Sequence, residues 1–567
     1  MTKENNSRPS VIASVLAWQS SILLVLSFLL SLLAVRFLLN DQGYTFHDET
    51  QIANFYEYFK AIKAGQFPPR WAPDSHFGFG SPFLTFNYPL PYYLGFVINS
   101  FGFGLVHTFK ILMALSVLVG ALGTFLLGSA LATPLIGLLA SVIYTYLPYH
   151  AVDVFVRGAL GESYSIAIFP FVLLALHYLI KNPTPIKKIY LGVVMSLFLL
   201  SHQIGSLLGF PLIFIFLFTF PGTLTIKNRF ISFCQSFLVT LGLSSFYLFP
   251  LVFERKYINE ASPFNFYDHF PFIKQLIYSP WGYGASQIGP NDGMSFQLGF
   301  PFLILLVLVI LKLKNRFRLV LLSVLGISLY LMNIRSSWAW NLLPLTQMVQ
   351  FPWRILIISL WLSPLLLISI APDYKFFKNK AIVIIISLLV VISGIGFYRP
   401  GELADHSDSY FLRRFLPTTV LVGGEKVSAD YLNFEEDYLT LPKGAIRPTS
   451  LPNSKLTTSD GLEVKLDQQS PFLYKTKISL NTRTNLTLHV FNFPGWVVKL
   501  DQNIIKHQSD ANGYITFGLD PGSYQLEIQF KESLVRRIGD IITLGSLLLL
   551  IQVLMYYSYK AYAKRRV

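Results

Sequence analysis

The chain has 567 residues, of which 53% are hydrophobic and only 13% are charged. Soluble domains carry about 25% charged residues, so this composition excludes a soluble globular protein and indicates a membrane protein with many spans. The formal net charge of +15 does not indicate a nucleic-acid binder, because the basic residues form short clusters between apolar segments. The single cysteine, Cys234, excludes a disulfide framework and a thiolate metal site.

Twelve apolar segments are candidates for membrane-spanning helices, since about 20 apolar residues cross a bilayer as a helix. They lie near residues 11–39, 106–128, 132–149, 163–180, 188–203, 204–220, 230–253, 296–311, 318–333, 351–371, 381–398 and 536–557. The first exceeds a signal-peptide core and lacks a small-residue cleavage site, so we expect a retained anchor. The short segment 89–103 is rich in Tyr and Phe, and we expect it to lie in the membrane interface.

The basic clusters between these segments predict the orientation of the chain. With segment 89–103 lying flat, all the clusters fall on the side of the N-terminus. The positive-inside rule then places both termini in the cytoplasm, and the loop 40–105 outside together with region 399–533.

The loop after the first apolar segment carries the motif Phe46-His47-Asp48-Glu49-Thr50. Apolar residues at helical spacing predict a helix over 50–64. Asp48 and Gln51 have the spacing of a capping box, which favours Asp48 as the N-cap of this helix. The other interpretation is a catalytic base, and one carboxylate can fill both roles.

Other charged residues are predicted at the same outer face. Arg157 and Glu162 lie in a loop between two spans, where they form either an ion pair that closes a helix end or a phosphate-binding site at Arg157. Arg354 opens a later span, so it either extends outward to water or faces a polar cavity. His202 lies at another outer end. Such convergence of charged groups at one face indicates a site.

From residue 399 to 532 the apolar runs are short and alternate with polar residues, as in 462–466, 473–480, 486–493, 496–500 and 524–530. Turn signals such as Asp510-Ala511-Asn512-Gly513 separate the runs, which predicts an antiparallel β-sandwich with Trp496 in its core. We therefore expect a polytopic α-helical transmembrane domain of about 12 helices over 1–398, a β-sandwich over 399–533, and a final helix with a basic tail over 534–567.

The sequence contains no Walker A loop, dinucleotide fingerprint, His-Glu-x-x-His motif or nucleophile elbow. These absences argue against a nucleotide-driven pump. A substrate that reacts outside the membrane must carry its own leaving group, and a lipid phosphate does so.

Several stretches carry a family resemblance. They are His47-Asp48, Gly65–Trp71, Tyr88–Tyr93, Pro148–Tyr149, Arg157–Ala159 with Glu162, and Phe351–Arg354. Together they resemble the GT-C glycosyltransferase superfamily and, more closely, bacterial membrane proteins related to 6-pyruvoyl-tetrahydropterin synthase. The tail, with Phe493–Trp496, Leu500-Asp501 and Pro521-Gly522, is similar to that of YfhO-type proteins. The His-rich zinc set of a pterin synthase is not found among these motifs.

The resemblance implies inverting transfer of a sugar from a polyprenyl-phosphate carrier to an envelope glycan or protein, outside the bacterial cytoplasmic membrane. In that scheme Asp48 deprotonates the acceptor hydroxyl, with Glu49 as a second catalytic candidate. The implied substrate- and phosphate-binding residues are Arg157, Arg354, His202, Tyr88, Arg70 and Glu162. A divalent metal, Mg or Mn, is implied at Asp48, Asp153 and His47. The stretch after Asp48 differs from the lysine-bearing loop of aminoarabinose transferases, which argues against lipid A as substrate.

The alternative function is a non-catalytic envelope protein, such as a lipid-linked glycan transporter or a scaffold that presents the β-domain. The two hypotheses differ in whether Asp48 takes part in chemistry or only in stability. A transferase requires Asp48, Arg157 and Arg354 to lie together around one site.

Overall fold

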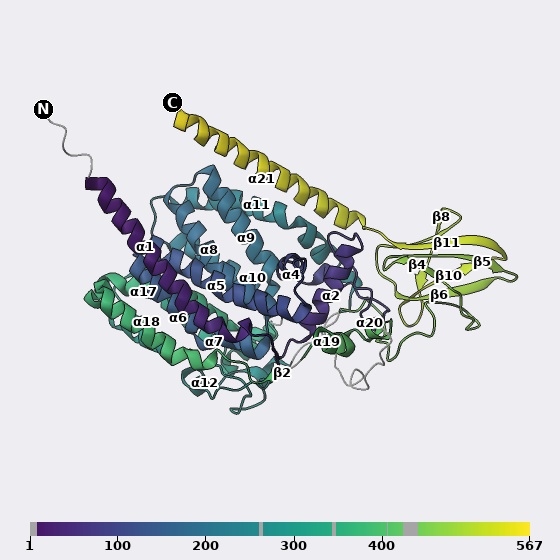
Figure 1. Ribbon diagram of the computed structural model, residues 1–567, viewed down its shortest axis with the longest axis horizontal. Helices are drawn as coiled ribbons and strands as arrows, with labels where there is room; N and C mark the ends of the chain where they lie inside the picture. The colour runs from purple at the N-terminus through teal and green to yellow at the C-terminus, as the bar shows by residue number, and fades with distance from the viewer. Residues whose placement is uncertain (1–7, 260–264, 343–347, 405, 423–439, 567) are drawn as a thin grey trace. The chain divides into compact units, whose positions relative to one another are not determined.

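The computed structural model describes residues 8–566 except 260–264, 343–347, 405 and 423–439 (Figure 1). The chain forms two compact units that interleave in sequence. Unit 1 comprises Met1–Asp48, Phe109–Thr240 and Pro263–Asp405, and unit 2 comprises Glu49–Thr108, Leu241–Ser262 and His406–Val567. The division differs from the expected domain boundary after residue 398, because the loop after the first apolar segment belongs with the β-domain.

Unit 1 is a bundle of apolar helices. They are α1 (Arg8–Leu32), α5 (Leu105–Leu131), α6 (Pro134–Tyr146), α8 (Leu160–Lys181), α9 (Pro185–Ser201), α10 (Gln203–Thr219), α11 (Ile226–Phe253), α13 (Phe300–Leu311), α14 (Arg316–Leu331), α17 (Leu356–Ile370) and α18 (Lys380–Gly394), of which α5 and α11 continue into unit 2. Nearly every residue of α8 and α17 is buried, and Trp361 of α17 stacks on Phe169 of α8 at 4.2 Å between ring centroids. Helices that are apolar on all sides belong in the interior of such a bundle.

Each predicted span falls on a helix, but the helices differ in length. Within the described chain, seven helices are long and apolar enough to cross a membrane, or up to nine if each of two bent pairs is counted as one span. Helices α10 and α13 are apolar but shorter. The structure therefore confirms a polytopic helical body, while the exact number of twelve crossings stays a prediction.

Segment 89–103 does not form a spanning helix. Helix α4 (Leu90–Asn99) has 10 residues, and at about 1.5 Å per residue it is about half as long as the hydrocarbon core is thick. Leu94, Val97 and Phe101 are exposed on it or just after it. Its position in the membrane interface stays a prediction.

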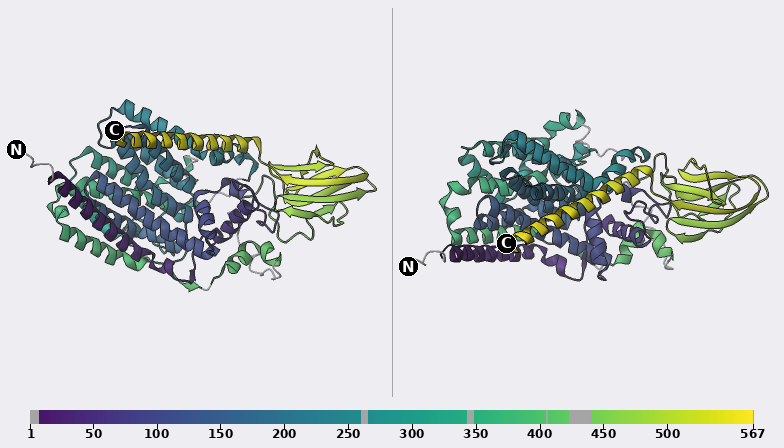
Figure 2. Two further views of the ribbon diagram at one scale, coloured as in Figure 1. Left: turned by 45° about the horizontal axis from the view of Figure 1, so that its top comes forward. Right: turned by 90° about the horizontal axis from the view of Figure 1, so that it is seen from above.

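Unit 2 contains two antiparallel sheets stacked face to face (Figures 1 and 2). One sheet has the order β3-β6-β10-β9 and the other β4-β5-β11-β7-β8. The strands are β3 (Leu456–Thr458), β4 (Asp467–Ser470), β5 (Leu473–Leu480), β6 (Thr484–Phe491), β7 (Trp496–Leu500), β8 (Asn503–Ile505), β9 (Gln508–Ser509), β10 (Tyr514–Leu519) and β11 (Gly522–Phe530). Alternate residues are buried, such as Leu486 and Leu488 on β6, so the predicted β-sandwich is confirmed.

The loop of residues 65–88 joins unit 2 through aromatic packing. Trp71 is 1% exposed and contacts Phe493, Trp496 and Phe530, with ring centroids 5.5–6.1 Å apart. The predicted core position of Trp496 is thereby confirmed. Burial of such large rings supplies much of the hydrophobic stabilisation of a small domain, which explains why this loop folds with the sandwich.

Helix α21 (Leu534–Arg566) follows the last strand directly (Figure 2). Its first turn is held by Arg536, which is fully buried and donates through Nε to Glu254 at 2.8 Å. Arg70 donates to Asp540 of the same helix at 2.7 Å. Buried charges must be paired, so these ion pairs join α21 to the end of α11 and to the loop.

Candidate functional site

The segment that leads to Asp48 is attached to the turn before Arg157, within unit 1. The turn η2 (Val152–Arg157) is a π-helix that ends at Arg157, so its last carbonyls have no partner inside the helix. The Tyr44 hydroxyl donates to the Val154 carbonyl at 2.9 Å, and the His47 amide donates to Val156 at 3.0 Å. The Asp48 amide donates to the Arg157 carbonyl at 2.9 Å. These bonds hold the Asp48 backbone directly beside Arg157.

Gly158 permits this attachment. Its φ of 64° lies in the left-handed region, and a Cβ there would lie 2.2 Å from the ring of Phe46. Phe46 in turn stacks on Phe109, with 4.6 Å between ring centroids. The absence of a side chain at residue 158 therefore sets the position of Phe46, two residues before Asp48.

We expect Gly158→Ala to destabilise the protein. The left-handed conformation alone costs an L-residue about 1–2 kcal/mol, and the methyl group must also displace Phe46. Thermal melting of the purified protein measures the effect. Gly326→Ala on α14 is the matched control, because a Cβ there meets no atom within 4 Å, and it should leave the melting temperature unchanged or raise it. Equal melting of the two variants would contradict this account of Gly158.

A buried cluster of charges lies beyond the Asp48 backbone. Arg157 donates through Nη1 to Asp153 and to Glu162 Oε2, the latter at 2.7 Å. Tyr149 donates to the other Glu162 oxygen at 2.6 Å. The Arg157 guanidinium also lies over the Trp353 ring, 4.8 Å from its centroid. The ion pair proposed between Arg157 and Glu162 is thus present, and it includes Asp153 as well.

Arg354 faces this cluster and does not extend outward to water. Its side chain is only 12% exposed, and its Nε lies 4.0 Å from Glu162 Oε2. Nη1 donates to the Gln350 side chain at 2.5 Å, and Nε makes no hydrogen bond to the described residues. The interpretation in which Arg354 extends to water is therefore wrong, because the bond to Gln350 and the attraction of Glu162 draw the guanidinium inward.

Asp48 is the accessible acid of the site. It is half-buried, and its carboxylate makes no direct hydrogen bond or ion pair with any described residue. It nevertheless acts electrostatically on Arg157 and Arg354. The structure thus brings together Asp48, Arg157 and Arg354, as the transferase hypothesis requires.

The capping interpretation of Asp48 is wrong. Helix α2 (Thr50–Lys63) has Glu49 at its N-cap, and no side chain caps it. The Gln51 side chain instead donates through Nε2 to the Tyr88 hydroxyl at 3.1 Å and accepts from the Tyr92 hydroxyl through Oε1. Local spacing suggested the cap, but the tertiary bond from the Asp48 amide to Arg157 and the partners of Gln51 prevent it.

His202 was expected to bind the substrate or its phosphate, and His47 to bind a metal ion. His202 is buried and accepts from the Gly205 amide at 3.1 Å, which caps α10, and it interacts electrostatically with Glu162. His47 is exposed, and its Nε2 lies 2.9 Å from the Tyr283 carbonyl. His202 therefore belongs to the edge of the charged cluster, while the His47 ring is turned toward another loop.

The expected metal at Asp48, Asp153 and His47 stays a prediction. No group of three His, Cys, Asp or Glu side chains that could hold a metal ion is found in the described part of the chain. Asp153 is already ion-paired with Arg157, and the His47 ring is already hydrogen-bonded to the Tyr283 carbonyl. The donor set of these three residues does not fit a metal site as it stands.

The other three expected site residues lie in unit 2 with partners of their own. Glu49 pairs with Arg414 at 3.0 Å; burial raises the pKa of Glu49, and Arg414 opposes that shift. Arg70 is 2% exposed and bound to Asp540, so its assignment as a phosphate ligand is corrected to a structural role. The Tyr88 hydroxyl accepts a hydrogen bond from the Gln51 side chain, and the Tyr88 ring stacks on the Tyr92 ring.

Sequence reasoning did not single out Tyr149 and Trp353, although both lie in stretches that carry the family resemblance. Tyr149 fixes Glu162, and Trp353 stacks on Phe351 at 5.2 Å while it contacts Arg157. Trp353 also donates to Ser286 at 3.2 Å. Ser286 gave no signal in the sequence, because its loop has neither a motif nor a periodic pattern.

Comparisons with solved structures find distant likenesses. Arabinofuranosyltransferase AftD from Mycobacteria matches with a TM-score of 0.42 and 15% identity over 67% of this chain and 26% of AftD. An oligosaccharyltransferase from Archaeoglobus fulgidus, solved with Zn and sulfate, matches with a TM-score of 0.37 and 14% identity over 76% of this chain and 58% of that one. The chain thus spans about a quarter of AftD, and at these values the likeness establishes neither fold nor activity.

No curated protein matches the chain. The family model described as "6-pyruvoyl-tetrahydropterin synthase related domain; membrane protein" matches residues 84–399, more than half of the chain. This range includes Arg157, Glu162, His202 and Arg354. The chain therefore belongs to the family of membrane proteins with a 6-pyruvoyl-tetrahydropterin synthase related domain.

Proposed function

We propose that this membrane protein is a GT-C-type glycosyltransferase that moves a sugar from a polyprenyl-phosphate carrier to an acceptor hydroxyl. The observation that carries the proposal is the position of the half-buried Asp48 beside the buried arginine cluster, with a carboxylate that makes no bond to a described residue. An acid of this kind next to fixed cations is the arrangement that transfer from a phosphate leaving group needs.

Asp48 is the general base in this proposal. Its carboxylate makes no bond within the described part of the chain and can accept from the acceptor hydroxyl, and its backbone is held at Arg157. The hydroxyl proton passes to Asp48 while the oxygen attacks the anomeric carbon. The bond from that carbon to the phosphate oxygen breaks on the opposite face, so the configuration inverts. The lipid phosphate leaves with the electron pair.

Arg354 is the better candidate for the leaving phosphate. Arg157 already shares its charge with Asp153 and Glu162, whereas the Arg354 Nε has no hydrogen-bond partner among the described residues. A guanidinium with a spare donor can bind phosphate oxygens strongly. Arg157 then acts as a positioning residue, because it holds Glu162 against Arg354.

The remaining assignments are proposals of the same kind. The site and the β-domain face the outside of the bacterial cytoplasmic membrane, both termini face the cytoplasm, and the acceptor is an envelope glycan or protein. The positive-inside distribution of basic residues supports this orientation. No step above passes through a metal ion.

A transfer assay with the purified full-length protein tests the function. The donor is a radiolabelled polyprenyl-phosphate sugar, and the readouts are labelled acceptor and released lipid phosphate. We expect both products, together with the loss of a specific modification when envelope glycans of a deletion strain are analysed by mass spectrometry. The non-catalytic alternative predicts binding of the donor without release of lipid phosphate, and that result would overturn the proposal.

A further inference from the structure

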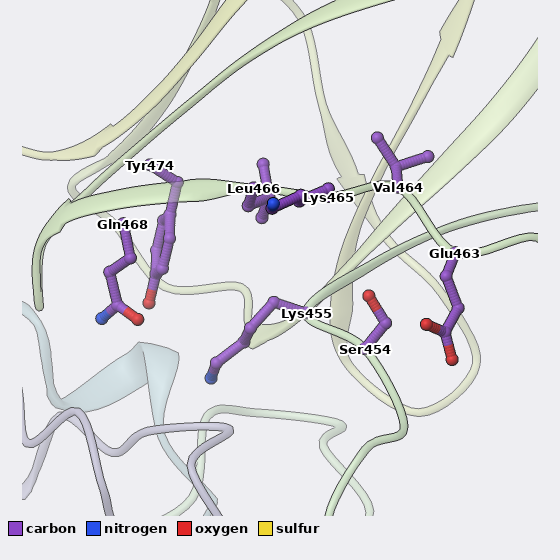
Figure 3. A pocket seen from close by; sticks show the side chains of 8 residues that line it. All are labelled: Ser454, Lys455, Glu463, Val464, Lys465, Leu466, Gln468 and Tyr474. Carbon is purple, nitrogen blue, oxygen red and sulfur yellow. The ribbon is translucent and has the colours of Figure 1, made fainter. Parts of the chain in front are cut away.

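The β-sandwich carries two adjoining cavities, both within unit 2, that the proposed reaction does not use. The first has a volume of about 460 Å³ and is bordered by Ser454, Lys455, Glu463, Lys465, Gln468 and Tyr474, among others (Figure 3). The second, of about 720 Å³, lies over β4, β5, β7 and β11 and shares Lys465 and Leu466 with the first. Ligand sites typically have volumes of about 300–1,000 Å³.

The first cavity is lined by a tyrosine whose ring is buried and whose hydroxyl is open to the cavity. Tyr474 is 3% exposed, and its ring stacks on Trp496 with 6.1 Å between centroids. Its hydroxyl reaches into the opening beside Gln468 (Figure 3), where neither side chain makes a hydrogen bond to a described residue. Both polar groups are open to the cavity, so they are available to hydrogen-bond to a ligand there.

The same cavity contains a lysine without a carboxylate partner. The Lys455 ammonium donates to the Gly78 carbonyl, and no described acid forms an ion pair with it. Burial lowers the pKa of Lys455 to about 8. A ligand carboxylate would satisfy the two remaining protons of the ammonium and favour its charged form.

The second cavity adds positive charge. Glu527 pairs with Lys475 at 3.2 Å and with Lys499 at 2.7 Å. Lys465 and Lys477 line the same cavity, are exposed, and have no carboxylate partner within the described residues. The acids Glu463, Asp467 and Glu527 also line the joined cavities, but the lining lysines outnumber them, so the charge of the described lining is positive.

We propose that the joined cavities bind an acidic saccharide. Lys455, Lys465 and Lys477 would pair with its carboxylates, and Tyr474 and Gln468 would bond to its hydroxyls. A neutral sugar would leave the lysines unpaired, and a plain polyanion would leave the uncharged polar groups unpaired. That this saccharide is the acceptor rests on the proposed transferase function, but its binding does not.

Calorimetric binding to the detergent-solubilised full-length protein tests the proposal with hexagalacturonate as the probe and maltohexaose as its neutral counterpart. We expect hexagalacturonate to bind and maltohexaose not to bind. The affinity for hexagalacturonate should fall as the salt concentration is raised. Lys465→Gln should weaken binding about tenfold, and Tyr474→Phe, which keeps the stacked ring, roughly threefold to tenfold. Lys443→Gln is the matched control, because Lys443 is an exposed cation outside both cavities.

Two results would overturn the proposal: equal binding of the acidic and neutral probes, or binding of hexagalacturonate that neither Lys465→Gln nor Tyr474→Phe weakens. Polyphosphate that binds as tightly as hexagalacturonate, with no effect of Tyr474→Phe, would show a response to charge alone and would also overturn it. Asp48→Asn separates this inference from the transfer reaction, since it should keep hexagalacturonate binding intact while transfer is lost.

Discussion

Asp48→Asn should abolish sugar transfer and leave the folded protein intact. The amide keeps the size of the carboxylate but cannot accept the acceptor proton, so we expect transfer to fall by roughly 10²–10⁴-fold. Because the Asp48 side chain makes no bond to a described residue, the free energy of unfolding should change by no more than about 0.5 kcal/mol, and the melting temperature should stay close to that of the wild type. Labelled-acceptor formation and thermal melting of one preparation measure the two effects.

Asp48→Ala distinguishes the base from a helix cap. Loss of an aspartate cap costs about 0.5–2 kcal/mol, whereas the structure places Glu49 at the N-cap of α2. We therefore expect Asp48→Ala to melt like the wild type and to lack transfer. Wild-type transfer in either variant would rule out the base assignment, and a large loss of stability with transfer retained would restore the structural interpretation.

Glu162→Gln should produce the largest loss of stability. Glu162 is 2% exposed and holds Arg157 at 2.7 Å while it attracts Arg354. Removal of one partner from a buried ion pair costs about 3–5 kcal/mol, because the remaining charge is left buried and uncompensated. Denaturation of the solubilised protein, followed by circular dichroism, measures the change.

Glu402→Gln is the control for this prediction, since Glu402 is exposed and its side chain has no ion-pair partner among the described residues. It should change stability by less than about 0.5 kcal/mol. The double variant Glu162→Gln with Arg157→Gln should lose less stability than the sum of the two single variants, because the two residues are coupled. Additive losses in the double variant would show that the ion pair does not carry the stability.

The strands of the β-domain show how far local pattern predicts a fold. The runs at 473–480 and 496–500 form β5 and β7 with the predicted bounds, since alternation of apolar and polar residues directly reflects burial of one face. The predicted strand at 462–466 is wrong, because the neighbouring strand β4 forms over Asp467–Ser470 instead. Those residues are polar and exposed, so backbone pairing with β5 forms the strand without an apolar signal.

The sequence predicted which residues belong to the site better than it predicted the role of each residue. The charges of Arg157, Glu162 and Arg354 stand out because charged residues at the ends of apolar segments are costly and rare. Their pairing depends on contacts between residues far apart in sequence, such as Arg354 with Glu162. Arg70 and Glu49 looked equally suitable, but their partners Asp540 and Arg414 come from segments that local pattern could not connect to them.

The sequence by itself determined the helical membrane body, the alternating strands of the β-domain and the presence of an acidic motif after the first apolar segment. Those features arise from local periodicity and composition, which each segment carries independently. Only the tertiary structure decided that the Asp48 backbone bonds to Arg157 and that its carboxylate caps no helix. That outcome depends on the end of a π-helical turn and on the space left by Gly158, and neither is encoded within the motif.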